Sequence, residues 1–241
     1  MRYLVNLSYD GSKFYGYQIQ KNKTTVEGEI ERVLSKLLNT KINSVGSSRT
    51  DRGVHSLDQY CHFDTDKKLD LRKFTHAMNG LIDKSIYIKK IIKVNDDFHA
   101  RYSVYKKEYI YKINLGEYNP IEKDYVYQYN KNIDRKLLDE FILLMSGEHN
   151  FRSFTSDKDS SSYVRNVKIS YKIQNKILYL KFESSGFLRY MIRNIVGLLL
   201  DINDGKKDII DIPKIFDSKD RCSCGKKADG VGLYLNKIEF M

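Results

Sequence analysis

Cysteine and tryptophan are scarce in this chain, which has three of the first and none of the second. The odd number and the spacing of Cys61, Cys222 and Cys224 do not make a disulfide framework, so we expect a reducing compartment. Cys222 and Cys224 could supply two metal ligands. No second pair of Cys or His lies at zinc-finger spacing, however, and tetrahedral zinc needs four ligands, or three and a water. The cysteines therefore predict no metal centre.

The chain also has no long apolar run, no low-complexity tract and no internal repeat. Its most apolar stretch, residues 187–202, is interrupted by Arg189, Arg193 and Asn194 and is too short to cross a bilayer. The first residues enter an alternating pattern directly and contain no apolar signal core. We therefore expect a soluble, cytoplasmic protein.

Positive charge is plentiful: 42 Lys and Arg oppose 31 Asp and Glu, which gives a net charge of +11. Such a balance favours a polyanionic partner, because neutralising phosphates releases counterions. A solvated Lys-rich surface explains the charge equally well. The 19 Tyr and 11 Phe suit stacking on unpaired bases where they lie beside basic residues, although we expect most of them in the core.

Hydrophobic periodicity predicts strands interspersed with amphipathic helices. Strands are expected at residues 2–9, 59–64, 86–94, 103–115, 164–174, 177–184 and 232–239. Helices are expected at residues 24–38, after Asp70, from Asp134 to Gly147, at 187–202 and near 207–217. Some strands are joined by short turns and others by helices. The pattern therefore predicts an α+β fold with a largely antiparallel sheet and a soft boundary near residue 100.

Local signals place the ends of two of these helices. Thr24 and Glu27 have the spacing of a capping box at the start of the first helix. Asp134 is a typical N-cap for the helix that we expect to end at Gly147.

The most informative segment is the polar stretch Ser47–His55, which lies between a predicted helix and a predicted strand. Asp51 stands in it between Arg49 and Arg52. Neighbouring guanidinium groups keep a carboxylate ionised, and an ionised, desolvated carboxylate can act as a nucleophile or a base. Composition alone favours a different role, in which Asp51 caps a turn and pairs locally with Arg49.

Six segments in chain order resemble the motifs of the tRNA pseudouridine synthase A family, and together they span the chain from residue 9 to residue 235. Any one of them alone would be weak to moderate evidence. They are YDGSKFYGYQ at 9–18, SSRTDRGVH at 47–55, DFHARYS at 97–103, KEYIY at 107–111, MIRNIVG at 191–197 and GLYL at 232–235.

The resemblance implies an isomerase that converts uridine to pseudouridine in tRNA without a cofactor or a metal. The bond from uracil N1 to C1′ of the ribose breaks, the base turns, and C5 joins C1′. Asp51 matches the family's nucleophile. The carboxylate could attack C1′, attack C6 or take a proton from the sugar, and the sequence leaves these three routes open.

The resemblance also assigns three residues to substrate binding. Tyr109 matches the Tyr that stacks on the base, Arg49 the Arg that helps to flip or hold the nucleotide, and Arg193 the Arg of the "MVRN" motif. Without the resemblance, Tyr109 would be expected as a core ring. Arg193 would then be either a buried cation, for which Asp51 is the natural acceptor, or a rim residue whose guanidinium reaches water.

The family fold comprises two α/β halves that share a largely antiparallel central sheet flanked by helices. We accordingly expect an N-terminal half at 1–102 that carries the catalytic loop, and a C-terminal half at 103–241 that completes the active-site cleft. The family also implies a homodimer and a target at positions thirty-eight to forty of the tRNA anticodon stem-loop.

Several positions depart from the family pattern. Ser48 replaces a Gly, Arg52 replaces an Ala beside the nucleophile, and Tyr17 replaces a Trp. The long Arg52 side chain could lower the pKa of Asp51, contact RNA or clash where only a methyl group fits. Arg189 and Tyr190 stand where relatives often have two His.

These departures leave two alternatives open, a divergent paralogue that modifies another RNA site and a non-catalytic RNA-binding protein on the same fold. A protein with an unrelated ligand, basic only for solubility, is a third. Candidate phosphate contacts are Lys13, Lys106, Lys107 and Arg189. For His99 and Arg101 we favour a structural role.

Overall fold

The computed structural model describes residues 1–241, and the chain divides into two compact units. The first unit comprises Met1–Lys107 and Tyr234–Met241, and the second comprises Glu108–Leu233. Residues 234–241, which the sequence analysis placed in the C-terminal half, lie in the first unit because the last strand pairs there. The functional division into halves at 1–102 and 103–241 stays a prediction.

The first unit is built on strand β1, whose alternating apolar side chains predicted it at the residues observed. β1 pairs antiparallel with β3 on one side, where Tyr3 faces Phe63, and with β4 on the other. β10 runs parallel to β3. The strands of this unit are β1 (Arg2–Tyr9), β2 (Ser44–Gly46), β3 (His55–Asp64), β4 (Ile86–Val94) and β10 (Leu233–Phe240).

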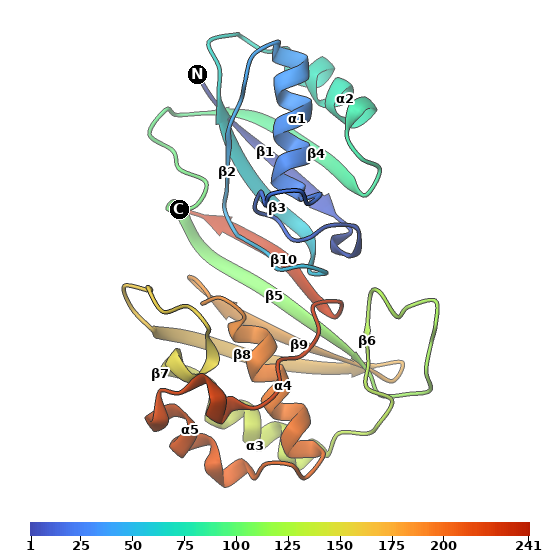
Figure 1. Ribbon diagram of the computed structural model, residues 1–241, viewed down its shortest axis with the longest axis vertical. Helices are drawn as coiled ribbons and strands as arrows, with labels where there is room; N and C mark the ends of the chain where they lie inside the picture. Colours follow the sequence, from blue (N-terminus) through green and yellow to red (C-terminus); the bar gives the residue numbers. More distant parts are fainter. The chain divides into compact units, whose positions relative to one another are not determined.

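Helices α1 (Val26–Leu38) and α2 (Leu71–Leu81) lie side by side over this sheet (Figure 1). The apolar stripe of α1 joins the strand side chains in one buried core. The N-cap of α1 is Thr25, whose hydroxyl accepts from Gly28 N at 3.3 Å, so the expected capping box from Thr24 is wrong by one residue. A short 3-10 turn, η1 (Gly11–Lys13), follows β1.

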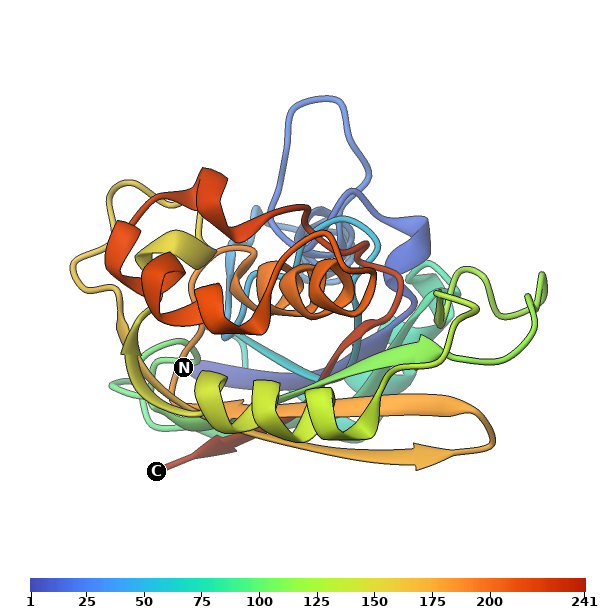
Figure 2. The ribbon, with the colours of Figure 1, turned by 90° about the horizontal axis from the view of Figure 1, so that it is seen from below.

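The second unit contains the predicted hairpin of β8 and β9, which run side by side to their turn (Figure 2). Asn175 and Lys176, the two residues of the hairpin loop, both have positive φ, as a type I′ turn requires. β7 pairs antiparallel with β8. The strands are β5 (Val104–Asn114, which begins in the first unit), β6 (Tyr127–Gln128), β7 (Gly147–Asn150), β8 (Val164–Gln174) and β9 (Ile177–Ser184).

The helices of the second unit are α3 (Arg135–Met145), α4 (Met191–Asn203) and α5 (Ile212–Ser218), with 3-10 turns η2 (Phe151–Phe154), η3 (Ile209–Asp211) and η4 (Arg221–Cys224). Asp134 caps α3 as expected, but the helix ends at Met145, two residues before Gly147. α4 is buried along most of its length and begins at Met191 rather than 187, because Tyr190 takes a left-handed backbone with φ of 64°.

Both units combine helices with mainly antiparallel strands, which confirms the α+β class. The parallel pairs are β10 with β3 and β5 with β6. No helix in residues 1–241 has both the length and the apolarity that crossing a membrane demands.

Candidate active site

Asp51 lies in the loop 47–54, between β2 and β3, where the backbone is neither helical nor extended. Its side chain is partly exposed. Its carbonyl accepts a hydrogen bond from Val54 N at 3.2 Å, which closes a turn, and Gly53 inside that turn has φ of 78°. The turn presents the carboxylate on a short, tightly bent segment of chain.

Buried hydrogen bonds fix the loop on the strand side. The Thr50 hydroxyl lies 2.7 Å from the hydroxyl of Tyr9 on β1. The Gln59 side-chain amide on β3 donates to Ser48 O at 2.7 Å, and the Ser47 hydroxyl donates to a β3 carbonyl at 2.7 Å. Because these groups are buried, breaking a bond would leave polar atoms unsatisfied. The residues just before Asp51 are therefore held by the sheet.

The segment 11–25 packs directly against the same loop and needs glycine at two places. Gly16 has φ of +99°, and a Cβ there would lie 2.9 Å from Thr50 O. A Cβ on Gly11 would lie 2.0 Å from Val54 O. Next to Gly16, Tyr17 N donates a hydrogen bond to Thr50 O at 3.0 Å. Glycine is required because the two backbones approach too closely for a side chain.

Lys107, near the start of β5, is half-buried, and its ammonium group anchors the loop. Its Nζ donates to Ser47 O at 2.7 Å and lies 3.3 Å from Ser48 Oγ. Burial, followed by the charges of Arg101 and Arg49, lowers the pKa of Lys107 to about 8. Its ammonium thus bonds the loop inside the protein, and the expectation that Lys107 contacts phosphate stays a prediction.

The two arginines beside Asp51 are exposed and differ in their contacts. Arg49 Nη1 donates to Gln18 Oε1 at 3.3 Å. The Arg52 guanidinium lies over the ring of Tyr15, 4.7 Å from the ring centroid. Because Arg52 points to the surface, it does not clash where the family has Ala.

Tyr109 and Arg193 belong to the second unit. Tyr109 on β5 is 7% exposed, and its ring meets Phe187 edge-to-face with centroids 5.3 Å apart. Arg193 lies in the first turn of α4, where its Nε donates to the carbonyl of Ala228 at 2.9 Å. Nothing in the sequence pattern predicts this bond to a backbone carbonyl.

The predicted site residues thus fall into two pairs, with Asp51 and Arg49 on one loop of the first unit, and Tyr109 and Arg193 in the second. Arg189 does not share a helical face with Arg193, because it precedes α4. His99 has the structural role that we favoured: its Nδ1 accepts from Arg101 N at 3.2 Å and from Tyr102 N at 3.3 Å.

The cysteine pair does not make a metal site. Cys224 is buried, its Sγ lies 3.6 Å from Asn194 O, and burial raises the pKa of its thiol to about 12. Zinc binds the thiolate, which this environment disfavours. No group of three or more His, Cys, Asp or Glu is arranged to hold a metal ion.

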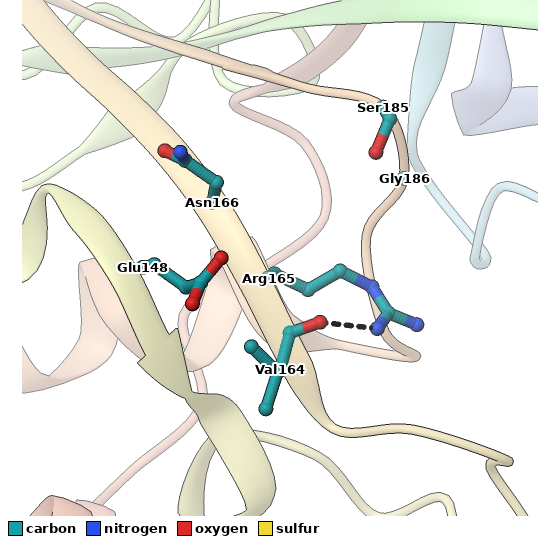
Figure 3. A pocket seen from close by; sticks show the side chains of 6 residues that line it. All are labelled: Glu148, Val164, Arg165, Asn166, Ser185 and Gly186. Atoms are coloured by element: carbon teal, nitrogen blue, oxygen red, sulfur yellow. Dashed lines mark hydrogen bonds between the residues drawn. The ribbon is translucent and has the colours of Figure 1, made fainter.

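A cavity of about 440 Å³ opens in the second unit, beside β7 and β8 (Figure 3). The Arg165 guanidinium lies in it and donates to the carbonyls of Ser162 at 3.0 Å and Val164 at 2.6 Å. None of the predicted site residues lines this cavity. Its lining residues are Glu148, Val164, Arg165, Asn166, Ser185 and Gly186.

Known proteins resemble the chain over nearly its whole length. The family model for tRNA pseudouridine synthase matches residues 7–103 and 142–241, which include Arg49, Asp51 and Arg193 but leave Tyr109 between the matched segments. The chain is 38% identical to tRNA pseudouridine synthase A of Mycoplasma genitalium, over 99% of this chain and 98% of that protein.

Two further relatives are equally similar. The chain is 39% identical to tRNA pseudouridine synthase A of Malacoplasma penetrans, over 98% of both chains. It is 39% identical to the protein of the same name from Geobacillus sp. (strain WCH70), over 99% of this chain and 98% of the relative. Similarity of this extent shows that the chain belongs to the tRNA pseudouridine synthase family.

Proposed function

We propose that this pseudouridine synthase isomerises uridine in tRNA with the Asp51 carboxylate as its nucleophile. The observation that carries the proposal is the fixation of the Asp51 loop. Buried bonds from β1 and β3, the backbone of the segment 11–25 and the Lys107 ammonium all hold residues adjacent to Asp51. A carboxylate on so rigid a support can be held within attacking distance of a bound nucleotide.

The reaction requires one ionised carboxylate near the ribose and the uracil. The N1–C1′ bond breaks, C5 of the turned base bonds to C1′, the C5 hydrogen leaves as a proton, and N1 takes up a proton from solvent. Asp51 could attack C1′ or C6, or take a proton from the sugar, and the product is the same by each route. The target base must first leave its stack to be reached.

Three further residues take roles in this proposal. Arg49 contacts the flipped nucleotide, since its exposed guanidinium is two residues from Asp51 and only Nη1 is engaged, by Gln18. Tyr109 stacks on the uracil, and its edge-to-face contact with Phe187 supports the orientation of its ring. Arg193 takes part in substrate binding, and the bond from its Nε to Ala228 O fixes where its guanidinium lies.

We further propose a target in the anticodon stem-loop at positions thirty-eight to forty, a homodimer and a cytoplasmic location. The first two come from the family resemblance. The three unpaired cysteines, of which Cys61 and Cys224 are buried, are typical of proteins from reducing compartments.

Tritium release from tRNA labelled at uridine C5 tests the nucleophile, because pseudouridine formation frees that hydrogen. Asp51→Ala removes the carboxylate, and Asp51→Asn keeps its shape without the charge. Asp66→Asn is a matched control, since Asp66 is an exposed carboxylate of the same unit. We expect wild type and Asp66→Asn to release tritium, and both Asp51 variants to release none while still binding tRNA.

Normal turnover by Asp51→Ala would show that the nucleophile is assigned wrongly. If the wild type released no tritium from any tRNA yet bound it, the non-catalytic RNA-binding alternative would be favoured. Binding that did not weaken steeply with added salt would instead indicate a ligand other than RNA.

A further inference from the structure

Two cations share one exposed aromatic ring beside the catalytic loop. Lys23 Nζ lies 4.5 Å from the centroid of the Tyr15 ring, and the Arg52 guanidinium carbon lies 4.7 Å from it. The Tyr15 side chain is 38% exposed. All three residues belong to the first unit.

Neither cation has a partner of opposite charge. Lys23 and Arg52 form no side-chain hydrogen bond and no ion pair in the protein, in contrast to Lys131 and Lys206, which share the carboxylate of Asp204. Their N–H donors are therefore directed to solvent. A guanidinium and an ammonium without acceptors are available to an external anion.

The surroundings of this cluster are strongly basic. The segment 11–25 and the loop 47–54, which pack against each other, contain five cations, and the only carboxylate is Asp51. The ring also restricts both long side chains, so that less rotamer entropy is lost when an anion binds. The cluster is thus suited in both charge and preorganisation to bind phosphate.

The cluster also lies at the place where the substrate strand must pass. Arg52 follows Asp51 directly, so their Cα atoms are about 3.8 Å apart. A nucleotide attacked by Asp51 therefore brings its own or a neighbouring phosphate within reach of the Arg52 side chain.

We propose that Lys23 and Arg52, held over the Tyr15 ring, form a phosphate clamp for the RNA strand that flanks the uridine presented to Asp51. The inference rests on the proposed function and deepens it, by naming residues that select and hold the substrate backbone. The ligand is the phosphodiester and not a base, because the two cations lie over the Tyr15 ring, where a base would have to stack.

Salt-dependent tRNA binding tests the clamp. The measurements are made with Asp51→Ala as the parent, so that the substrate is not consumed, and add Arg52→Ala, Lys23→Ala or both. Each lost phosphate contact should flatten the slope of log affinity against log salt by about 0.7 to 0.9, and weaken binding about three- to tenfold at low salt. Arg72→Ala, which removes an exposed cation on α2, is the matched control and should leave slope and affinity unchanged.

The ring has its own test. Tyr15→Leu alone should weaken binding, because the cations lose their support. When Tyr15→Leu is added to the double variant Lys23→Ala/Arg52→Ala, the affinity for tRNA should not fall further. A further loss in that background would mean that Tyr15 stacks on a base, and the clamp as proposed would be wrong.

The clamp and the proposed function fail in different ways. An unchanged salt slope in Arg52→Ala and Lys23→Ala, with wild-type tritium release intact, would overturn the clamp and leave the enzyme assignment standing. Absence of release by the wild type would overturn the function itself, whatever the slopes.

Discussion

Replacing Lys107 by Met should reduce catalysis strongly while leaving the protein as stable as before. The substitution keeps a linear side chain on β5 and removes only the ammonium that donates to Ser47 O and approaches Ser48 Oγ. If Lys107 holds the catalytic loop in place, its loss lets Asp51 move relative to the substrate. Misplacement by about 1 Å can cost on the order of 100-fold in rate, so we expect kcat to fall by about 10- to 100-fold.

The stability effect follows from the charge that Lys107 buries. Its pKa falls from an ordinary 10.5 to about 8. At neutral pH this difference corresponds to a cost of roughly 3 kcal/mol for keeping the ammonium charged in the folded state. The hydrogen bonds lost with it are worth about 1.5 to 3 kcal/mol. The two nearly cancel, so the free energy of unfolding of Lys107→Met should lie within about 1.5 kcal/mol of the wild type.

The pH dependence gives an independent check on the buried charge. Between pH 8 and 10.5 the unfolded chain holds the Lys107 proton and the folded chain has lost it. The unfolded state then binds more protons, so this group makes the wild type more stable as the pH rises. Urea unfolding across this range should show a gain in the wild type relative to Lys107→Met.

The control is Lys106→Met, which removes the neighbouring lysine that pairs with Glu239 on β10. Single-turnover tritium release should fall in Lys107→Met, remain near wild type in Lys106→Met and recover in part in Lys107→Arg. The reasoning would be refuted if Lys107→Met kept its kcat, or if its activity fell only in proportion to its unfolded fraction.

Two further predictions concern stability. His62 is buried, its Nδ1 accepts from Ala100 N at 3.1 Å, and burial together with the charge of Arg2 lowers its pKa to about 4. Because the unfolded chain takes up this proton first, the unfolding free energy should fall as the pH drops from 6.5 towards 4, by up to about 3 kcal/mol, and His62→Gln should lack this part of the slope. In α4, a Cβ on Gly197 would lie 1.8 Å from Lys226 O, so Gly197→Ala should lower the unfolding free energy by more than about 2 kcal/mol in urea titrations. A loss below about 0.5 kcal/mol would contradict the close packing.

The spacing of apolar residues predicted most helices and strands, because that spacing is what buries one face of each element. It did not predict the exact ends of two helices, which depend on backbone conformation. The periodicity of α1 predicted its extent, but two successive threonines, Thr24 and Thr25, could each cap it. Apolar composition continued the α4 prediction back to 187. The helix begins only after Tyr190, because that residue has a left-handed backbone, which the spacing of apolar residues does not predict.

The catalytic loop shows the same division. Its motif proposes Asp51 and Arg49 from the sequence alone, since both lie within a few residues of each other, and their roles stay a prediction. The role of Lys107 depends on acceptors some 60 residues earlier in the chain, so alternation along β5 could not reveal that its ammonium is buried. Likewise, Arg52 lies over Tyr15 because the segment 11–25 packs against the loop, a contact that the sequence pattern does not reveal.

The parallel pairing of β10 with β3 makes the order of synthesis matter. Residues 108–233 are translated between the two parts of the first unit, which takes roughly 6 to 25 s at about 5 to 20 residues per second. During that time the start of β3, next to the catalytic loop, has an open edge, and unpaired edges invite association with other strands. The nascent enzyme therefore contains Asp51 long before the strand that completes the support of its loop.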